Sequence, residues 1–227
     1  MKYYKYKMNI GVGNLLSLIL AIPLFIVYYL LFPNFYESIT FSKMPILLLW
    51  FILHEVIHFF GYLINKDVSI KDLYLGIYME KGIFYCQCSK KVSKKTILIS
   101  LMSPFTLIGV LTLIISKIYN LPFLGLLSIL NMIGSIFDII MFIQIIKMPK
   151  DVMFAEFDDP DAYYLISKKD LTKYKTISLD MVESDNLDTK KLKSKQNSRI
   201  TITKKSYIYL ILFIIFCFSV DYLLNNL

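Results

Sequence analysis

Residues 44–64 read MPILLLWFILHEVIHFFGYLI, an apolar stretch interrupted by two histidines and one glutamate. Its length is close to the roughly 20 residues that cross a bilayer as an α-helix. Ionisable side chains at membrane depth cost several kcal/mol unless a partner or a bound cation compensates them. The stretch therefore predicts a transmembrane helix that carries a polar site.

The same apolar character recurs along the chain. Hydrophobic residues make up 56% of the sequence and the mean hydropathy is +0.58, above the apolar share of about 45–50% in soluble domains. Four further stretches approach the length of a membrane span: residues 10–32, 96–116, 122–146 and 207–224. The predicted fold class is an all-α, multi-pass membrane protein with five transmembrane helices.

The basic residues indicate the orientation. All but two of the 25 Lys and Arg residues lie before the first span, between the second and third, or between the fourth and fifth. Positive loops stay cytoplasmic, so we expect a cytoplasmic N-terminus and an extracellular C-terminus in a cell membrane. The +8 net charge thus reflects membrane topology, and no nucleic-acid partner is expected because the sequence has no recognisable nucleic-acid-recognition module.

The composition is rich in Ile, Lys and Asn, which suggests a bacterium with an AT-rich genome.

Three regions follow from this pattern. Residues 1–146 are predicted to form a membrane-embedded core of four helices with a cytosolic segment at 65–95. Within that segment, Asp72–Met79 and Ile83–Cys88 are rich in Tyr, Ile and Phe and are joined at Glu80-Lys81-Gly82, which predicts a cytosolic β-hairpin. Residues 147–206 are predicted to be cytosolic and partly disordered, and residues 207–227 to form the last transmembrane helix.

His54 and His58 are the only two histidines of the chain. A spacing of four residues places both imidazoles on one face of a helix, where they can share a tetrahedral metal ion such as zinc. The alternative is a pair of hydrogen-bonded core residues with Glu55 as their partner. Chance alone is a poor explanation for the His-Glu-x-x-His pattern.

A catalytic zinc site usually has three protein ligands, so a third must come from elsewhere. Asp138 is the only other carboxylate well inside the first four spans. It lies nine residues before Lys147, as the histidines are centred nine residues before Asn65, so both sit about 13–14 Å from the cytosolic end. The rivals are Cys217, Asp221 and the acidic cluster at 156–161.

The fourth span carries further polar residues. Asn131, Ser135 and Asp138 fall on one helical face, and Gly134 would allow a close helix approach. For Asn131 and Ser135, ordinary hydrogen bonds between helices are an equally good interpretation.

His54-Glu55-Val56-Ile57-His58 with Gly61, Ser103-Pro104, and the segment from Asn131 to Asp138 together resemble a bacterial family of small integral-membrane zincin peptidases. The resemblance covers about residues 45–160 and extends more distantly to the site-2 protease class of intramembrane zinc metalloproteases. In that class the ligand aspartate is followed by glycine, whereas Ile139 follows Asp138 here.

The resemblance implies a zinc metalloendopeptidase that cleaves a membrane protein or peptide near the cytosolic side. His54, His58 and Asp138 would hold zinc, Glu55 would act as general base, and Asn131 would help to position the substrate. The hairpin would hold an extended substrate by strand addition. The alternative function is a non-catalytic scaffold or transport protein with a structural metal site, which usually has four protein ligands.

Overall fold

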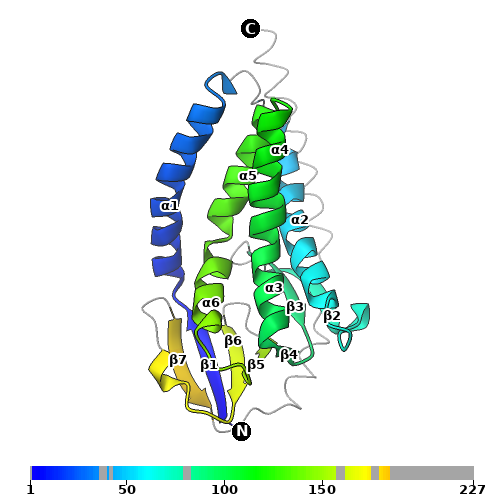
Figure 1. Cartoon of the computed structure of the whole chain (residues 1–227), viewed down its shortest axis with the longest axis vertical. Coiled ribbons are helices and arrows are strands. Elements are labelled where there is room, and N and C mark those ends of the chain that lie inside the picture. Colours follow the sequence, from blue (N-terminus) through cyan, green and yellow to red (C-terminus); the bar gives the residue numbers. More distant parts are fainter. Residues whose placement is uncertain are drawn as a thin grey trace.

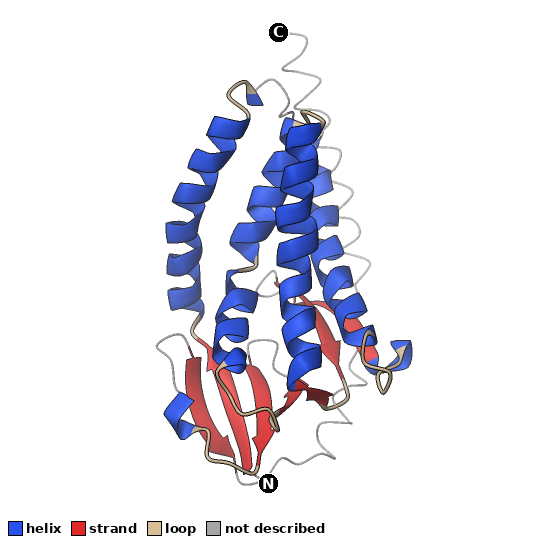
Figure 2. Ribbon diagram, viewed as in Figure 1, coloured by secondary structure: helices blue, strands red, loops and turns tan. Residues whose placement is uncertain are grey.

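The computed structural model describes residues 2–35, 40, 43–78, 83–156, 162–174 and 179–184. Figure 1 shows a bundle of long helices standing on a small β-sheet, and Figure 2 shows that the strands gather at one end of the bundle. The α-helices are α1 (Ile10–Leu31), α2 (Met44–Leu63), α3 (Lys94–Pro104), α4 (Thr112–Ile118), α5 (Pro122–Gly134) and α6 (Ile136–Ile146).

Three of the predicted membrane spans appear as single apolar helical stretches. They are Ile10–Leu31, Pro45–Leu63 and Lys94–Ile118, each long and apolar enough to cross a bilayer. A fourth is present if α5 and α6, which are bent by 47° at a short break, count as one span. Large apolar side chains along α1 and α2 are exposed, as expected for surfaces that face lipid. The predicted fifth span, 207–224, lies outside the described residues.

The third span widens after its proline. Phe105–Leu111 (η4) forms π-helical turns between α3 and α4, beginning directly after Pro104. Proline lacks an N–H and crowds the preceding turn, so it removes one α-helical hydrogen bond and favours an irregular turn next to it. Wider turns of this kind are frequent at functional sites. The backbone of the third span is therefore irregular at the level where the other helices carry their polar residues.

The break between α5 and α6 has a local cause. The Ser135 hydroxyl donates to the Asn131 carbonyl at 2.8 Å, and the Ser135 N–H bonds to the same carbonyl. Serine that bonds back to the preceding turn bends a helix. Because α6 begins anew at Ile136, Asp138 lies in its first turn.

A five-stranded antiparallel sheet was not predicted. Its order is β4-β5-β6-β1-β7, from β1 (Lys2–Met8), β4 (Val92–Ser93), β5 (Met153–Glu156), β6 (Ala162–Ser167) and β7 (Leu179–Ser184). The fold class of an all-α protein with one hairpin is therefore too narrow, because both the N-terminal segment and part of 147–206 form strands. Tyr4 and Tyr6 on β1 are fully buried and alternate with Lys5 and Lys7, the period-two pattern of a strand.

The predicted hairpin is present. β2 (Leu73–Tyr78) and β3 (Ile83–Cys88) pair antiparallel, with Leu73 opposite Cys88 and Leu75 opposite Cys86. The short 3-10 turn Ile70–Asp72 (η3) leads into β2, and a second one, Thr172–Tyr174 (η5), follows β6. The hairpin packs against α2 (Figure 1), so it lies beside the helix that carries the two histidines.

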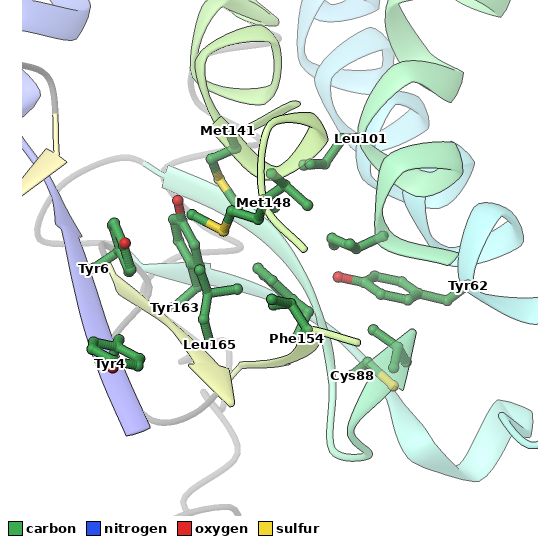
Figure 3. Close-up of a cluster of buried hydrophobic side chains, with 14 of the residues drawn as sticks. Tyr4, Tyr6, Tyr62, Cys88, Leu101, Met141, Met148, Phe154, Tyr163 and Leu165 are labelled. Atoms are coloured by element: carbon green, nitrogen blue, oxygen red, sulfur yellow. The ribbon is translucent and has the colours of Figure 1, made fainter. Parts of the chain in front are cut away.

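The main core joins the sheet to the helix ends. Figure 3 shows Tyr4 and Tyr6 of β1 on one side of this cluster and Tyr62 of α2 on the other. The rings of Tyr6 and Tyr163 stack at 5.5 Å, and those of Phe154 and Tyr163 at 5.1 Å. Such aromatic pairs contribute about 0.5–1.5 kcal/mol beyond burial. These ring pairs join neighbouring strands, and the same buried cluster includes Tyr62, Leu101 and Met141 of the helices, so the sheet and the helix ends share one core.

Gly61 sets the close approach of α2 to α3. A Cβ at this position would lie 2.6 Å from the Ser100 Cα, a backbone atom that cannot rotate away. Gly134, predicted from sequence to allow such an approach, has only the Phe51 ring at 4.0 Å from its would-be Cβ. The tight contact therefore belongs to Gly61.

Gly61→Ala is expected to lower stability by about 1–3 kcal/mol, because overpacking at a backbone contact forces the two helices apart. The measurement is the midpoint of thermal unfolding in detergent. Gly134→Ala is the matched control and should leave the midpoint nearly unchanged. Equal midpoints for wild type and Gly61→Ala would show that α3 is not held at this distance.

Candidate metal centre

Two of the candidate ligands come from consecutive turns of α2. The Nε2 atoms of His54 and His58 lie 3.0 Å apart, and the rings meet edge to face. Residues four apart share one face of a helix, which is the arrangement predicted from the sequence. Both imidazoles are largely enclosed, with side-chain exposures of 12% and 9%.

Asp138 completes the cluster from the first turn of α6. Its Oδ2 lies 3.2 Å from His54 Nε2 and 3.4 Å from His58 Nε2. The bend at Ser135 makes this residue part of a helix N-terminus, where the helix dipole favours a carboxylate. The structure therefore brings together His54, His58 and Asp138 in a group that could hold a metal ion.

The other ring nitrogens face acceptors. His54 Nδ1 lies 2.9 Å from Asn131 Oδ1, and His58 Nδ1 lies 2.9 Å from the Ser100 carbonyl oxygen. The Asn131 amide is oriented by its Nδ2, which donates to the Pro104 carbonyl at 3.0 Å. Because both partners can only accept, each Nδ1 carries a hydrogen, and each imidazole in its neutral form leaves its Nε2 lone pair for a metal ion.

These three donor atoms fit a tetrahedral metal. Two imidazole nitrogens and a carboxylate oxygen converge on one point, an arrangement that is favourable when a cation or a proton lies between them. Ligand atoms about 2.0–2.2 Å from a tetrahedral zinc are separated by roughly 3.3–3.6 Å. The observed separations of 3.0, 3.2 and 3.4 Å are close to the lower end of that range.

Glu55 lies beside the cluster and not in it. It is partly buried, and its carboxylate accepts a hydrogen bond from the backbone N–H of Cys86 on β3. A residue next to the first histidine points about 100° round the helix, so it can face the open side of a metal held by the histidines. The hairpin thus contributes directly to the surroundings of this glutamate.

The contacts of Asn131 are hydrogen bonds between helices, one of the two interpretations that the sequence allowed. Its side chain is 2% exposed, and both of its polar groups contact protein, His54 on one side and the Pro104 carbonyl on the other. It contacts Nδ1 of the His54 ring, whereas Nε2 of the same ring faces the cluster. Its predicted contact with substrate stays a prediction.

The rival ligands are not among the described side chains. Residues 157–161, the side chain of Glu156, and Cys217 and Asp221 all lie outside the part of the chain that the structure describes. Sequence reasoning missed Ser100, which is 1% exposed and whose hydroxyl also donates to the His58 carbonyl at 3.0 Å. A signal was available in Gly61, since a glycine one turn after His58 indicates a neighbouring backbone.

A His-Glu-x-x-His helix with a carboxylate ligand from another element defines a class, the zincin-type metallopeptidases. Residues 47–153 match the model of a protein family described as "Putative zincin peptidase". The match covers slightly less than half of the chain and includes both histidines, Glu55 and Asp138. No curated protein and no solved structure matches the chain. The relation to the site-2 class and the bacterial origin stay predictions.

Proposed function

We propose that the protein is an intramembrane zinc metallopeptidase that hydrolyses peptide bonds of membrane-associated substrates. The observation that carries this proposal is the convergence of His54, His58 and Asp138 beside Glu55 within the helical bundle. The family match supports the metallopeptidase level. The apolar helices that surround the site support its position within the membrane.

The side chains have distinct tasks in this proposal. Zinc, when bound, supplies a Lewis acid that polarises the scissile carbonyl and makes water a better nucleophile at neutral pH. Glu55 accepts the proton of the attacking water and then delivers it to the leaving amine, so that the C–N bond breaks without releasing an anionic nitrogen. Asn131 and Ser100 hold the two imidazoles in the orientation that binds metal.

The cytosolic side is proposed as the side of cleavage. The N-terminal strand, the hairpin and the strands after α6 gather at one end of the bundle (Figure 1). These strands belong to the segments 1–9, 65–95 and 147–206, which together carry all but two of the 25 Lys and Arg residues of the chain. Positive segments tend to remain in the cytoplasm, which supports a cytosolic position for this end of the bundle.

A transmembrane helix hides its peptide bonds, so a substrate has to be extended before it is cleaved. The strand β3 is suited to hold it. The Ser89 N–H donates to the Asp72 carbonyl across the hairpin, so by alternation the Cys86 N–H points away from β2. That N–H reaches Glu55, which places the outer side of β3 next to the proposed general base. We propose that the substrate strand lies along this side.

The test uses the full-length protein in liposomes. Elemental analysis should find about one zinc per chain, and a mixture of synthetic single-span peptides should be cleaved, as read by mass spectrometry. Cleavage should cease with 1,10-phenanthroline and return with added zinc, because the metal supplies the Lewis acid. A protein that holds no zinc after reconstitution would exclude a peptidase. Bound zinc without cleavage, with Cys217 or Asp221 as a fourth ligand, would indicate a structural site.

A further inference from the structure

We infer that Asn131 is a positioning residue that fixes His54 for metal binding by tying its imidazole to the backbone of the third span. The inference deepens the proposed function and rests on it. Three elements meet in this link: His54 from α2, Asn131 from α5, and the Pro104 carbonyl at the start of η4.

A carboxamide has the acceptor and the donor that these two contacts need. The Asn131 Oδ1 accepts from His54 Nδ1 at 2.9 Å, and its Nδ2 donates to the Pro104 oxygen at 3.0 Å. The donation to a carbonyl, which can only accept, determines which end of the amide faces the histidine. The acceptor facing His54 in turn keeps the hydrogen on Nδ1 and leaves Nε2 for the metal.

The surroundings make this link hard to replace. Asn131 is 2% exposed and is surrounded by helices, so no water is at hand to substitute for either contact. The neighbouring Gly109 lies close, with the Asn131 Nδ2 3.5 Å from its would-be Cβ. The amide therefore sits between α2 and the π-helical segment, and the position of His54 depends on how the third span widens after Pro104.

Each histidine has its own support. His54 relies on the Asn131 side chain, whereas His58 relies on the backbone carbonyl of Ser100. A change at Asn131 should therefore disturb one imidazole and leave the other as an internal control. Partners that orient metal-binding histidines typically contribute 10- to 100-fold in metal affinity.

The experiment exploits the presence of only two histidines. In 15N-histidine-labelled full-length protein in detergent, two Nδ1–H signals protected from solvent exchange are expected, with or without zinc. Asn131→Leu should lose the His54 signal and keep the His58 signal, and its zinc dissociation constant, measured by chelator competition, should rise by about 10- to 100-fold. A His58→Gln sample lacks the His58 signal, so the signal that remains is assigned to His54.

Ser128→Ala is the matched control on the same helix. Ser128 is fully buried and shares a hydrogen bond of 2.7 Å with Thr112, a contact between helices that does not involve the histidines. This variant should keep both signals and the zinc affinity of the wild type. Asn131→Asp retains an acceptor for His54 and should also keep both signals. The comparison with Asn131→Leu therefore distinguishes the hydrogen bond that orients the His54 ring from the packing of the side chain at position 131.

Two results would overturn the inference. One is an Asn131→Leu protein that keeps both protected signals and the zinc affinity of the wild type. The other is an Asn131→Asp protein that loses the His54 signal while keeping that of His58. If the Asn131→Leu variant fails to fold, the Asn131→Asp variant tests the inference in its place. A wild type that binds no zinc would remove the proposed function, but the two signals would still test the link in the metal-free protein.

Discussion

Replacing Asp138 with alanine is expected to abolish zinc binding at the proposed site, weakening it by more than about 100-fold. The variant removes the only charged ligand of the cluster and leaves two neutral imidazoles to hold a dication in an apolar bundle. A cation at membrane depth is costly in free energy when no carboxylate compensates its charge. Elemental analysis of purified protein, together with chelator competition, measures the loss directly.

Asp151→Ala serves as the control for this prediction. The Asp151 carboxylate is 46% exposed and pairs only loosely with Lys169, at 3.9 Å. Its removal should leave the zinc content at that of the wild type. If Asp138→Ala retained full zinc, the third ligand would have to come from elsewhere, with residues 156–161 examined first.

Glu55→Gln should reduce peptide cleavage by about 10²- to 10⁴-fold, the usual contribution of a general base. Glutamine has nearly the same shape and can still accept the hydrogen bond from the Cys86 N–H, but it cannot take a proton from water. Folding and metal binding should therefore survive. The measurement is the rate of cleavage of the synthetic single-span peptides in liposomes.

The zinc content of Glu55→Gln is the decisive companion measurement. One zinc per chain with cleavage lost would separate the chemistry of Glu55 from the integrity of the site. Cleavage within about tenfold of the wild type would mean that another group handles the proton. Loss of zinc together with cleavage would instead make Glu55 part of the metal-binding set.

The histidine pair and the hairpin could be predicted because their signals are local. Two histidines four residues apart on a long helix must lie on one face. Two short stretches rich in Tyr, Ile and Phe, joined at Glu80-Lys81-Gly82, indicate a strand pair without reference to the rest of the chain. The grouping of His54, His58 and Asp138 needed one more argument, equal depth from the cytosolic end, and the structure places the three together.

The five-stranded sheet could not be predicted in the same way. The strand β1 lies between β6 and β7, whose residues follow more than 150 positions later, and no local pattern encodes such a pairing. The lysines of β1 were interpreted as an indication of membrane orientation. The tyrosines that alternate with them were therefore not interpreted as a strand pattern. The contacts of Asn131 with His54 and Pro104 involve two other helical segments, so they appear only in three dimensions.

The central position of β1 has a consequence for how the molecule is made. Its residues precede α1, yet both of its partner strands are synthesised after all the helices from α1 to α6. Closing so long a loop is slow, and it exposes an unpaired strand in the meantime. The strand β1 thus waits for its final neighbours until the last helix of the described bundle has been translated, so the completed sheet is a late product of folding.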